Sequence, residues 1–148
     1  AWNYFQSVEA PENANFIKKW KTFTKDEKRV TNDPMEAHYI GFNMWVKAVE
    51  KVGTTDPDKV IAALPGISVP NLTGGMSTML ANHHITKPVL IGEIQANGQF
   101  EVVSKTDDLV PGDAWSDFLP DSRLLKSDWV ELKCGSYNTE TKTCVGGS

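Results

Sequence analysis

The spacing of apolar residues changes midway along the chain, and this change limits the folds that are open to it. Up to about residue 64, apolar side chains recur every three to four residues, which is typical of amphipathic α-helices. From about residue 76 they alternate with polar residues, which is typical of β-strands. The sequence therefore predicts an α/β chain in which three helices precede the main strands.

The first two helices have recognisable ends. The first is expected at about residues 11–25, where a proline occupies the first turn and an apolar stripe follows. The second is expected at about residues 34–52, because Asp33 can cap it, Glu36 stands three residues later and Gly53 supplies a left-handed stop. A broad apolar face on this helix predicts cover on more than one side; its residues are Met35, Tyr39, Phe42, Trp45, Val46 and Val49.

A third, short helix is expected at about residues 57–64, after a capping aspartate and a proline. Two alternating segments then flank an Asn-Gly pair, which favours a tight reversal, so an antiparallel hairpin is expected at about residues 89–104. The later residues are rich in Asp, Pro, Ser and Gly. We therefore expect a folded part at residues 1–106 and an irregular extension at residues 107–148.

The first eight residues also resemble a strand, with Trp2, Tyr4 and Phe5 close together, and residues 76–80 predict another. The N-terminal strand has no parallel partner in the chain. We therefore expect a fragment or processed product that completes a fold begun elsewhere, or a chain that pairs with a second copy through an exposed sheet edge. Trp2, Asn3 and Tyr4 either pack within this strand or line the junction at its end.

Composition excludes several classes of protein. The net charge of −4 argues against a nucleic-acid partner, because such proteins usually carry a basic face. The sequence has no apolar run near the roughly 18 residues that a membrane-spanning helix needs. Values of 40% hydrophobic and 23% charged residues are those of an ordinary globular domain.

Cys134 and Cys144 lie close together in the polar extension. A disulfide between them would close a small loop and contribute about 2–3 kcal/mol, which suits an oxidising compartment. Two free thiols are the alternative. Zinc is disfavoured, because two cysteines without nearby histidines do not complete a tetrahedral site.

Motifs for catalysis are missing from the sequence: it has no GxSxG elbow, P-loop, GxGxxG turn or HExxH pair. His83 and His84 are adjacent, so their side chains diverge and do not readily share one metal. We predict a protein that is not an enzyme and needs no cofactor or metal.

Glu36 has two possible roles. It can cap its own helix, or it can present a carboxylate to a cleft and accept N–H groups of a small amide. Tyr39 lies one turn further on and either adds a hydroxyl to the same cleft or packs as a core aromatic.

Several segments, in this order and spacing, resemble the urea-binding protein of urea ABC transporters. The late cysteines resemble the end of that family too. The segments are Ala1-Trp2-Asn3-Tyr4-Phe5, Pro11-Glu12-Asn13, Asp33-Pro34-Met35-Glu36-Ala37-His38-Tyr39, Asn82-His83-His84, Lys87-Pro88-Val89 and residues 92–100.

The resemblance implies the C-terminal part of a type I periplasmic-binding fold, in which two Rossmann-like α/β lobes close on a ligand. It implies urea or a short amide as ligand, with Glu36, Tyr39 and Met35 as candidate contacts. The implied partners are the permease subunits of the transporter and the remaining N-terminal part of the same protein. The implied location is periplasmic or extracellular, with a membrane anchor in the missing part as one option.

Two other functions stay open. The first is an amide-sensing regulatory protein of the same fold, for which the two cysteines would be reduced. The second is a hydrolase that uses His83 or His84.

Overall fold

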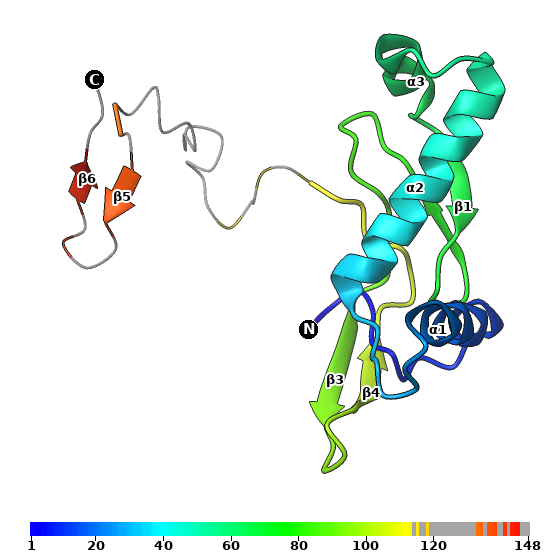
Figure 1. Ribbon diagram of the computed structural model, residues 1–148, viewed down its shortest axis with the longest axis vertical. Helices are drawn as coiled ribbons and strands as arrows, with labels where there is room; N and C mark the ends of the chain where they lie inside the picture. Colours follow the sequence, from blue (N-terminus) through cyan, green and yellow to red (C-terminus); the bar gives the residue numbers. More distant parts are fainter. Residues whose placement is uncertain are drawn as a thin grey trace. The chain divides into compact units, whose positions relative to one another are not determined.

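The computed structural model describes residues 1–113 without a gap, and then residues 115, 118, 133, 134, 136–138, 141 and 143–145. It divides into two compact units, Ala1–Ala114 and Trp115–Ser148 (Figure 1). The first unit continues past the boundary expected after residue 106. Lys87 and Val110 form an antiparallel bridge there, with N–H···O distances of 3.0 and 2.8 Å in the two directions.

Three helices come first along the chain, which confirms the expected fold class. They are α1 (Pro11–Thr24), α2 (Asp33–Val52) and α3 (Pro57–Ala63). Asp56 caps α3 as expected, accepting the N–H of Lys59 at 3.2 Å. The expected cap of α2 is wrong: Asn32, not Asp33, accepts the N–H of Met35 at 3.0 Å.

The strands of the first unit form two separate antiparallel pairs. The hairpin is confirmed, with Gly98 in the left-handed region at φ 78° and Gln95 N–H bonded to the Gln99 carbonyl at 2.8 Å. The short pair contains a strand that sequence reasoning missed. The pairs are β3 (Leu90–Ile94) with β4 (Phe100–Lys105), and β1 (Ser68–Pro70) with β2 (Met76–Thr78).

The N-terminal segment is not a regular strand. Trp2 forms one antiparallel bridge with Leu90, with N–H···O distances of 2.9 and 2.7 Å. A buried hydroxyl then fixes the segment, since the Tyr4 hydroxyl lies 2.7 Å from both Asn13 Oδ1 and Thr31 Oγ1. The segment is therefore held by α1 and by the loop before α2 rather than by parallel strands.

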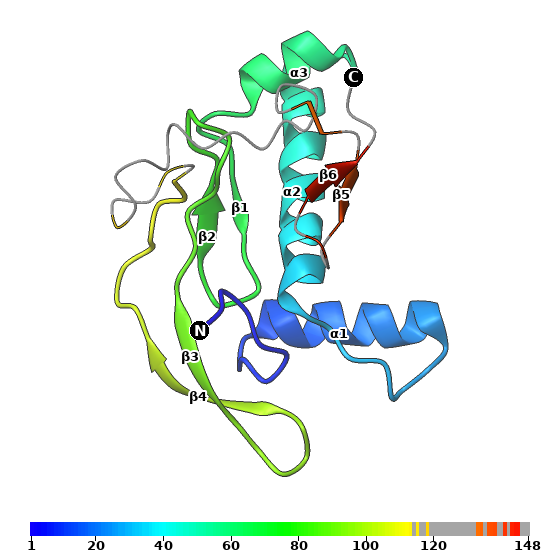
Figure 2. The same ribbon diagram turned by 90° about the vertical axis from the view of Figure 1, so that its left-hand side faces the viewer.

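The core lies on one side of α2. Figure 2 shows α1 running across the N-terminal end of α2, while α3 lies at the other end. The buried side chains of α2 are spaced four residues apart and pack with α3 and with the segment that leads into β1. The core residues are Ile40, Met44, Ala48, Val60, Ala63, Ile67 and Val69.

The apolar face expected for α2 is only partly covered. Phe42 and Trp45 are 61% and 40% exposed and stack on each other with ring centroids 5.8 Å apart. The helix has apolar residues on two sides, and within the described residues only one of these sides meets the core. In the part of the chain that the structure describes, no helix is both long enough and apolar enough to cross a bilayer.

The second unit contains a short antiparallel pair, β5 (Ser136–Asn138) and β6 (Thr143–Val145). Cys134 and Cys144 form a disulfide there, with Cα atoms 4.9 Å apart. The structure thus contains the pairing expected from the sequence.

Candidate functional site

Glu36 lies in the first turn of α2 and is completely buried, with 0% of its surface exposed. Its Oε2 forms an ion pair with Lys87, and its Oε1 accepts the backbone N–H of Leu72 at 3.4 Å. Burial raises the pKa of the Glu36 carboxyl, and the Lys87 ammonium opposes that rise. Both oxygens therefore have partners, so Glu36 acts neither as a helix cap nor as a free acceptor in this structure.

Local structure places Lys87 opposite Glu36. Lys87 is held by its backbone bridge to Val110, and the next residue, Pro88, accepts the Asn3 side-chain N–H at 2.7 Å. The lysine stem is almost fully buried, with 9% of the side chain exposed. A buried ammonium requires a charged or polar partner, and Glu36 provides one. The pair fastens α2 to the segment that leads into β3.

Asp33, one turn before Glu36, is in a different situation. Its carboxyl accepts the backbone N–H of Asn3. Its Oδ1 is buried and has no hydrogen-bond partner among the residues that the structure describes. Burial raises the pKa of the Asp33 carboxyl, and the charge of Lys87 partly offsets this. Asp33 therefore carries a desolvated acceptor that no described donor satisfies.

Two hollows meet at Asp33. The smaller, of about 150 Å³, lies between the start of α2, the N-terminal segment and the turn of the β3–β4 hairpin. The larger, of about 280 Å³, lies toward the loop of His84 and the bridge at Lys87. The start of α2 thus borders open space on two sides.

The three residues proposed from the sequence as ligand contacts do not share one cavity. Glu36 lies in the core, Met35 is half-buried, and Tyr39 packs against Phe16 with ring centroids 4.9 Å apart. Tyr39 lines a different groove, of about 450 Å³, between α1, α2 and β1. The groove also contains Glu12, Asn15, Asn43, Lys47 and Glu50.

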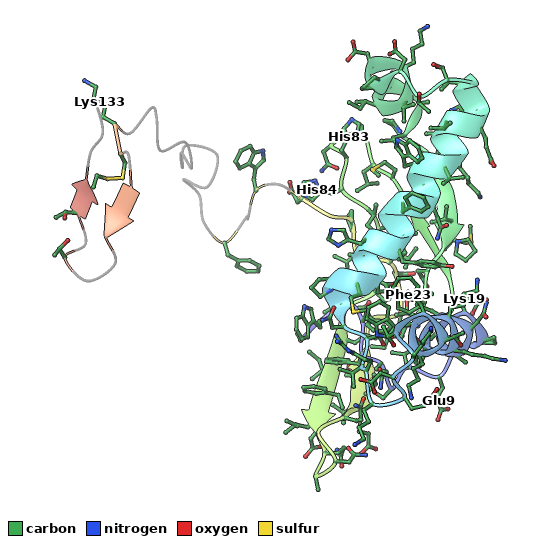
Figure 3. All side chains as sticks on the ribbon, in the orientation of Figure 1. Glu9, Lys19, Phe23, His83, His84 and Lys133 are labelled. Carbon is green, nitrogen blue, oxygen red and sulfur yellow. A yellow bond between two sulfur atoms is a disulfide. The ribbon has the colours of Figure 1, made fainter. Side chains whose placement is uncertain are left out.

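The histidine pair lies in an exposed turn (Figure 3). His83 has φ 61°, and the His84 N–H is bonded to Asn82 Oδ1 at 3.0 Å. Within the described residues, no three His, Cys, Asp or Glu side chains are grouped so that they could hold a metal ion.

Solved structures with the same arrangement are solute-binding proteins of ABC transporters. The chain resembles one from Rhodopseudomonas palustris HaA2 in complex with p-hydroxybenzoic acid, with 27% identity and a TM-score of 0.59. A second, from Rhodopseudomonas palustris BisB5 with 3,4-dihydroxybenzoic acid, has 19% identity and a TM-score of 0.61 and shows the fold alone. The alignments cover 70% and 72% of this chain but only 29% and 30% of those chains.

The sequence itself decides the family. Residues 1–121 match the periplasmic binding protein domain family, and the chain belongs to that family. A curated protein called limonene hydroxylase, from Geobacillus stearothermophilus, is 30% identical over 109 residues. That match covers 74% of this chain and 20% of the curated protein. The chain thus spans about a fifth of this curated relative and under a third of the two solved relatives.

Sequence reasoning missed two residues of the site. The pairing of Lys87 with Glu36 cannot be predicted from the sequence, because the two residues are 51 positions apart and no local pattern links them. The sequence predicts Asp33 as the cap, although Asn32 directly before it is an equally good capping residue. The nearby apolar residues Ile85 and Val89, with Pro88 between Lys87 and Val89, are a weak local signal for a buried charge.

Proposed function

We propose that the complete protein is the substrate-binding component of an ABC transporter, which binds urea or a short amide between two lobes and delivers it to the permease. The observation that carries this proposal is the family match over residues 1–121. The similarity to a solute-binding protein in a complex with p-hydroxybenzoic acid supports the transport role. The choice of urea rests on the ordered segments that resemble urea-binding proteins.

The proposed location is periplasmic or extracellular. The family supports it, and so does the Cys134–Cys144 disulfide, because disulfides persist in oxidising compartments. The same disulfide favours a transport protein over a cytosolic amide sensor.

We also propose that the protein performs no chemistry on its ligand. His83 and His84 lie in an exposed turn, and of the two hollows beside Asp33 only the larger, of about 280 Å³, is lined by one of them, His84. No described carboxylate or cysteine is grouped with the pair as a metal site would require. The hydrolase alternative predicts turnover of urea or amide that disappears on His84→Ala. Stoichiometric binding without turnover would rule out the hydrolase alternative.

The test is calorimetric titration of the full-length protein with urea, acetamide and p-hydroxybenzoate. The proposal expects saturable binding of urea or acetamide at a stoichiometry of one. Binding of p-hydroxybenzoate but not of urea or acetamide would show that the ligand is an aromatic acid and not an amide. Binding of none of the three would overturn the proposed ligand class.

Of the candidate contacts, Tyr39 and Met35 stay proposals. Tyr39→Phe and Met35→Ala, titrated in the same way, test them. Glu36 is better assigned to positioning, because its two oxygens are already bonded.

A further inference from the structure

We infer that the outer side of α2, centred on Phe42 and Trp45, is a docking surface for an apolar, uncharged face of the remaining N-terminal part of the same protein. The inference rests on the proposed function, because it takes the chain to be one portion of a longer, two-lobed protein. It goes beyond that function by naming the surface through which the two portions are held together.

The first support is a stripe of apolar residues along α2. Phe42, Trp45, Val49 and Val52 recur at i, i+3, i+7 and i+10, so they share one face of the helix. Val49 and Val52 are partly buried against the core. Phe42 and Trp45 are 61% and 40% exposed, and their rings stack with centroids 5.8 Å apart. The stripe is therefore covered at one end and open at the other, and its open end continues the core.

The second support is the distribution of charge on α2. A helix whose outer side faces water normally carries charged residues on that side, but residues 37–46 contain no Asp, Glu, Lys or Arg. The charged residues that flank this segment turn to the core side: Glu36 is buried, and Lys47 donates to the carbonyl of the first residue of β1 at 2.9 Å. His38 Nδ1 lies 2.8 Å from the carbonyl oxygen four residues earlier in the same helix. The outer side of α2 thus has the composition of an interior surface.

The third support is the amount of protein that lies outside this chain. The alignments cover only 29% and 30% of two solved solute-binding proteins, so a protein of their length has most of its residues left to pack against α2. A second copy of the chain fits less well. A stable interface between two proteins buries about 800 Å² on each partner, whereas two aromatic side chains bury roughly 300–500 Å² even when they are completely covered. Packing within one polypeptide needs no such minimum, because its parts are already joined.

The lack of charge on the outer side of α2 also defines the kind of surface that fits it. A carboxylate or an ammonium buried against Phe42 and Trp45 would lose its water without gaining a partner. The opposing surface is therefore built from aliphatic or aromatic side chains, which pack against the two stacked rings.

The experiment measures how fast a maleimide labels an introduced cysteine in the complete protein, without reductant, so that Cys134 and Cys144 stay in their disulfide. Phe42→Cys is compared with Ala62→Cys, the matched control, because Ala62 is exposed on α3. We expect Phe42→Cys to react at least about tenfold more slowly than the control in the native protein, since covered sites react only through local opening. In guanidinium the two rates should be equal. Circular dichroism checks the fold, and Trp45→Cys replaces Phe42→Cys if the latter does not fold.

Equal native rates would overturn this inference and leave the proposed function intact, because ligand binding is measured separately by titration. Protection that disappears when the protein is diluted to a monomer, as followed by sedimentation, would assign the surface to a second copy and overturn the inference too. Deletion of residues 115–148 tests cover by the second unit: protection that persists supports the inference, and protection that is lost would overturn it. A protein that protects Phe42→Cys but binds no amide would keep the inference and overturn the proposed ligand class.

Discussion

The carboxylate of Glu36 is paired with the ammonium of Lys87, 51 residues further along the chain, and both side chains are buried. The pair joins the first turn of α2 to the segment that enters β3. The β3–β4 hairpin begins three residues after Lys87. The ion pair therefore holds the N-terminal end of α2 close to the start of the hairpin. Breaking the ion pair should therefore lower the stability of the fold.

Lys87→Met should destabilise the protein by about 3–5 kcal/mol, because it leaves the Glu36 charge buried without a partner. Guanidinium unfolding, followed by circular dichroism, measures the loss. Guanidinium is chosen because urea is the proposed ligand.

The double variant Glu36→Gln/Lys87→Met provides the control for that experiment. It removes both charges, so it should recover much of the stability that Lys87→Met loses. Strict additivity of the two single changes would show that the buried contact is not a coupled ion pair.

Tyr4 should make stability sensitive to alkaline pH. Burial raises its pKa from 10.0 in the unfolded chain to about 12 in the folded state. The folded state therefore holds the phenol proton more tightly than the unfolded chain does. The contribution of Tyr4 to the free energy of unfolding is complete below about pH 10 and is lost as the pH rises toward 12.

Tyr4→Phe tests this through the difference in unfolding free energy between about pH 9 and pH 12. At neutral pH the variant should lose about 1–3 kcal/mol, because Asn13 and Thr31 lose their hydroxyl partner. Its stability should then decline less with pH than that of the wild type. Parallel declines in the two proteins would contradict the role assigned to Tyr4.

Gly92 allows the ring of Phe5 to lie close to the backbone of β3. A Cβ there would lie 2.8 Å from two ring atoms of Phe5 and 3.1 Å from the Cβ of Phe100. Gly92→Ala should therefore cost about 1–3 kcal/mol by overpacking, visible as a lower melting temperature. Gly41→Ala is the matched control, since nothing lies within 4 Å of its Cβ position. In the middle of α2 it should stabilise by about 0.5–1 kcal/mol.

The Cys134–Cys144 disulfide should be present in protein purified without reductant. Mass spectrometry of the intact protein should then show a mass lower by two hydrogens than after reduction. Replacing both cysteines by serine should lower stability by about 2–3 kcal/mol, most of it local to the second unit. Two free thiols in freshly exported protein would weaken the proposed location.

Local signals explain most of the correct predictions. Pro11, Pro57 and Gly53 mark helix ends through constraints on their own backbone, so α1, α2 and α3 were found close to their observed limits. Asn97-Gly98 marked the hairpin turn for the same reason. The cap of α2 was assigned one residue late, because Asn32 and Asp33 are both good caps and only the backbone geometry distinguishes them.

The spacing of apolar residues in α2 does not predict which side of the helix is buried. Phe42 and Trp45 were expected in an apolar face, but Ile40, Met44 and Ala48 face the described core. A helix with apolar residues on two sides has two candidate faces, and the neighbours decide which is buried.

The sequence by itself determined the helices, the hairpin and the family, because each depends on residues that are adjacent or regularly spaced along the chain. The tertiary structure alone decided that Glu36 is bound by Lys87, while Asp33 Oδ1 has no donor among the residues that the structure describes. The physical reason is that the state of a carboxylate depends on burial and on donors brought from distant parts of the chain, and neither is encoded in the spacing around it.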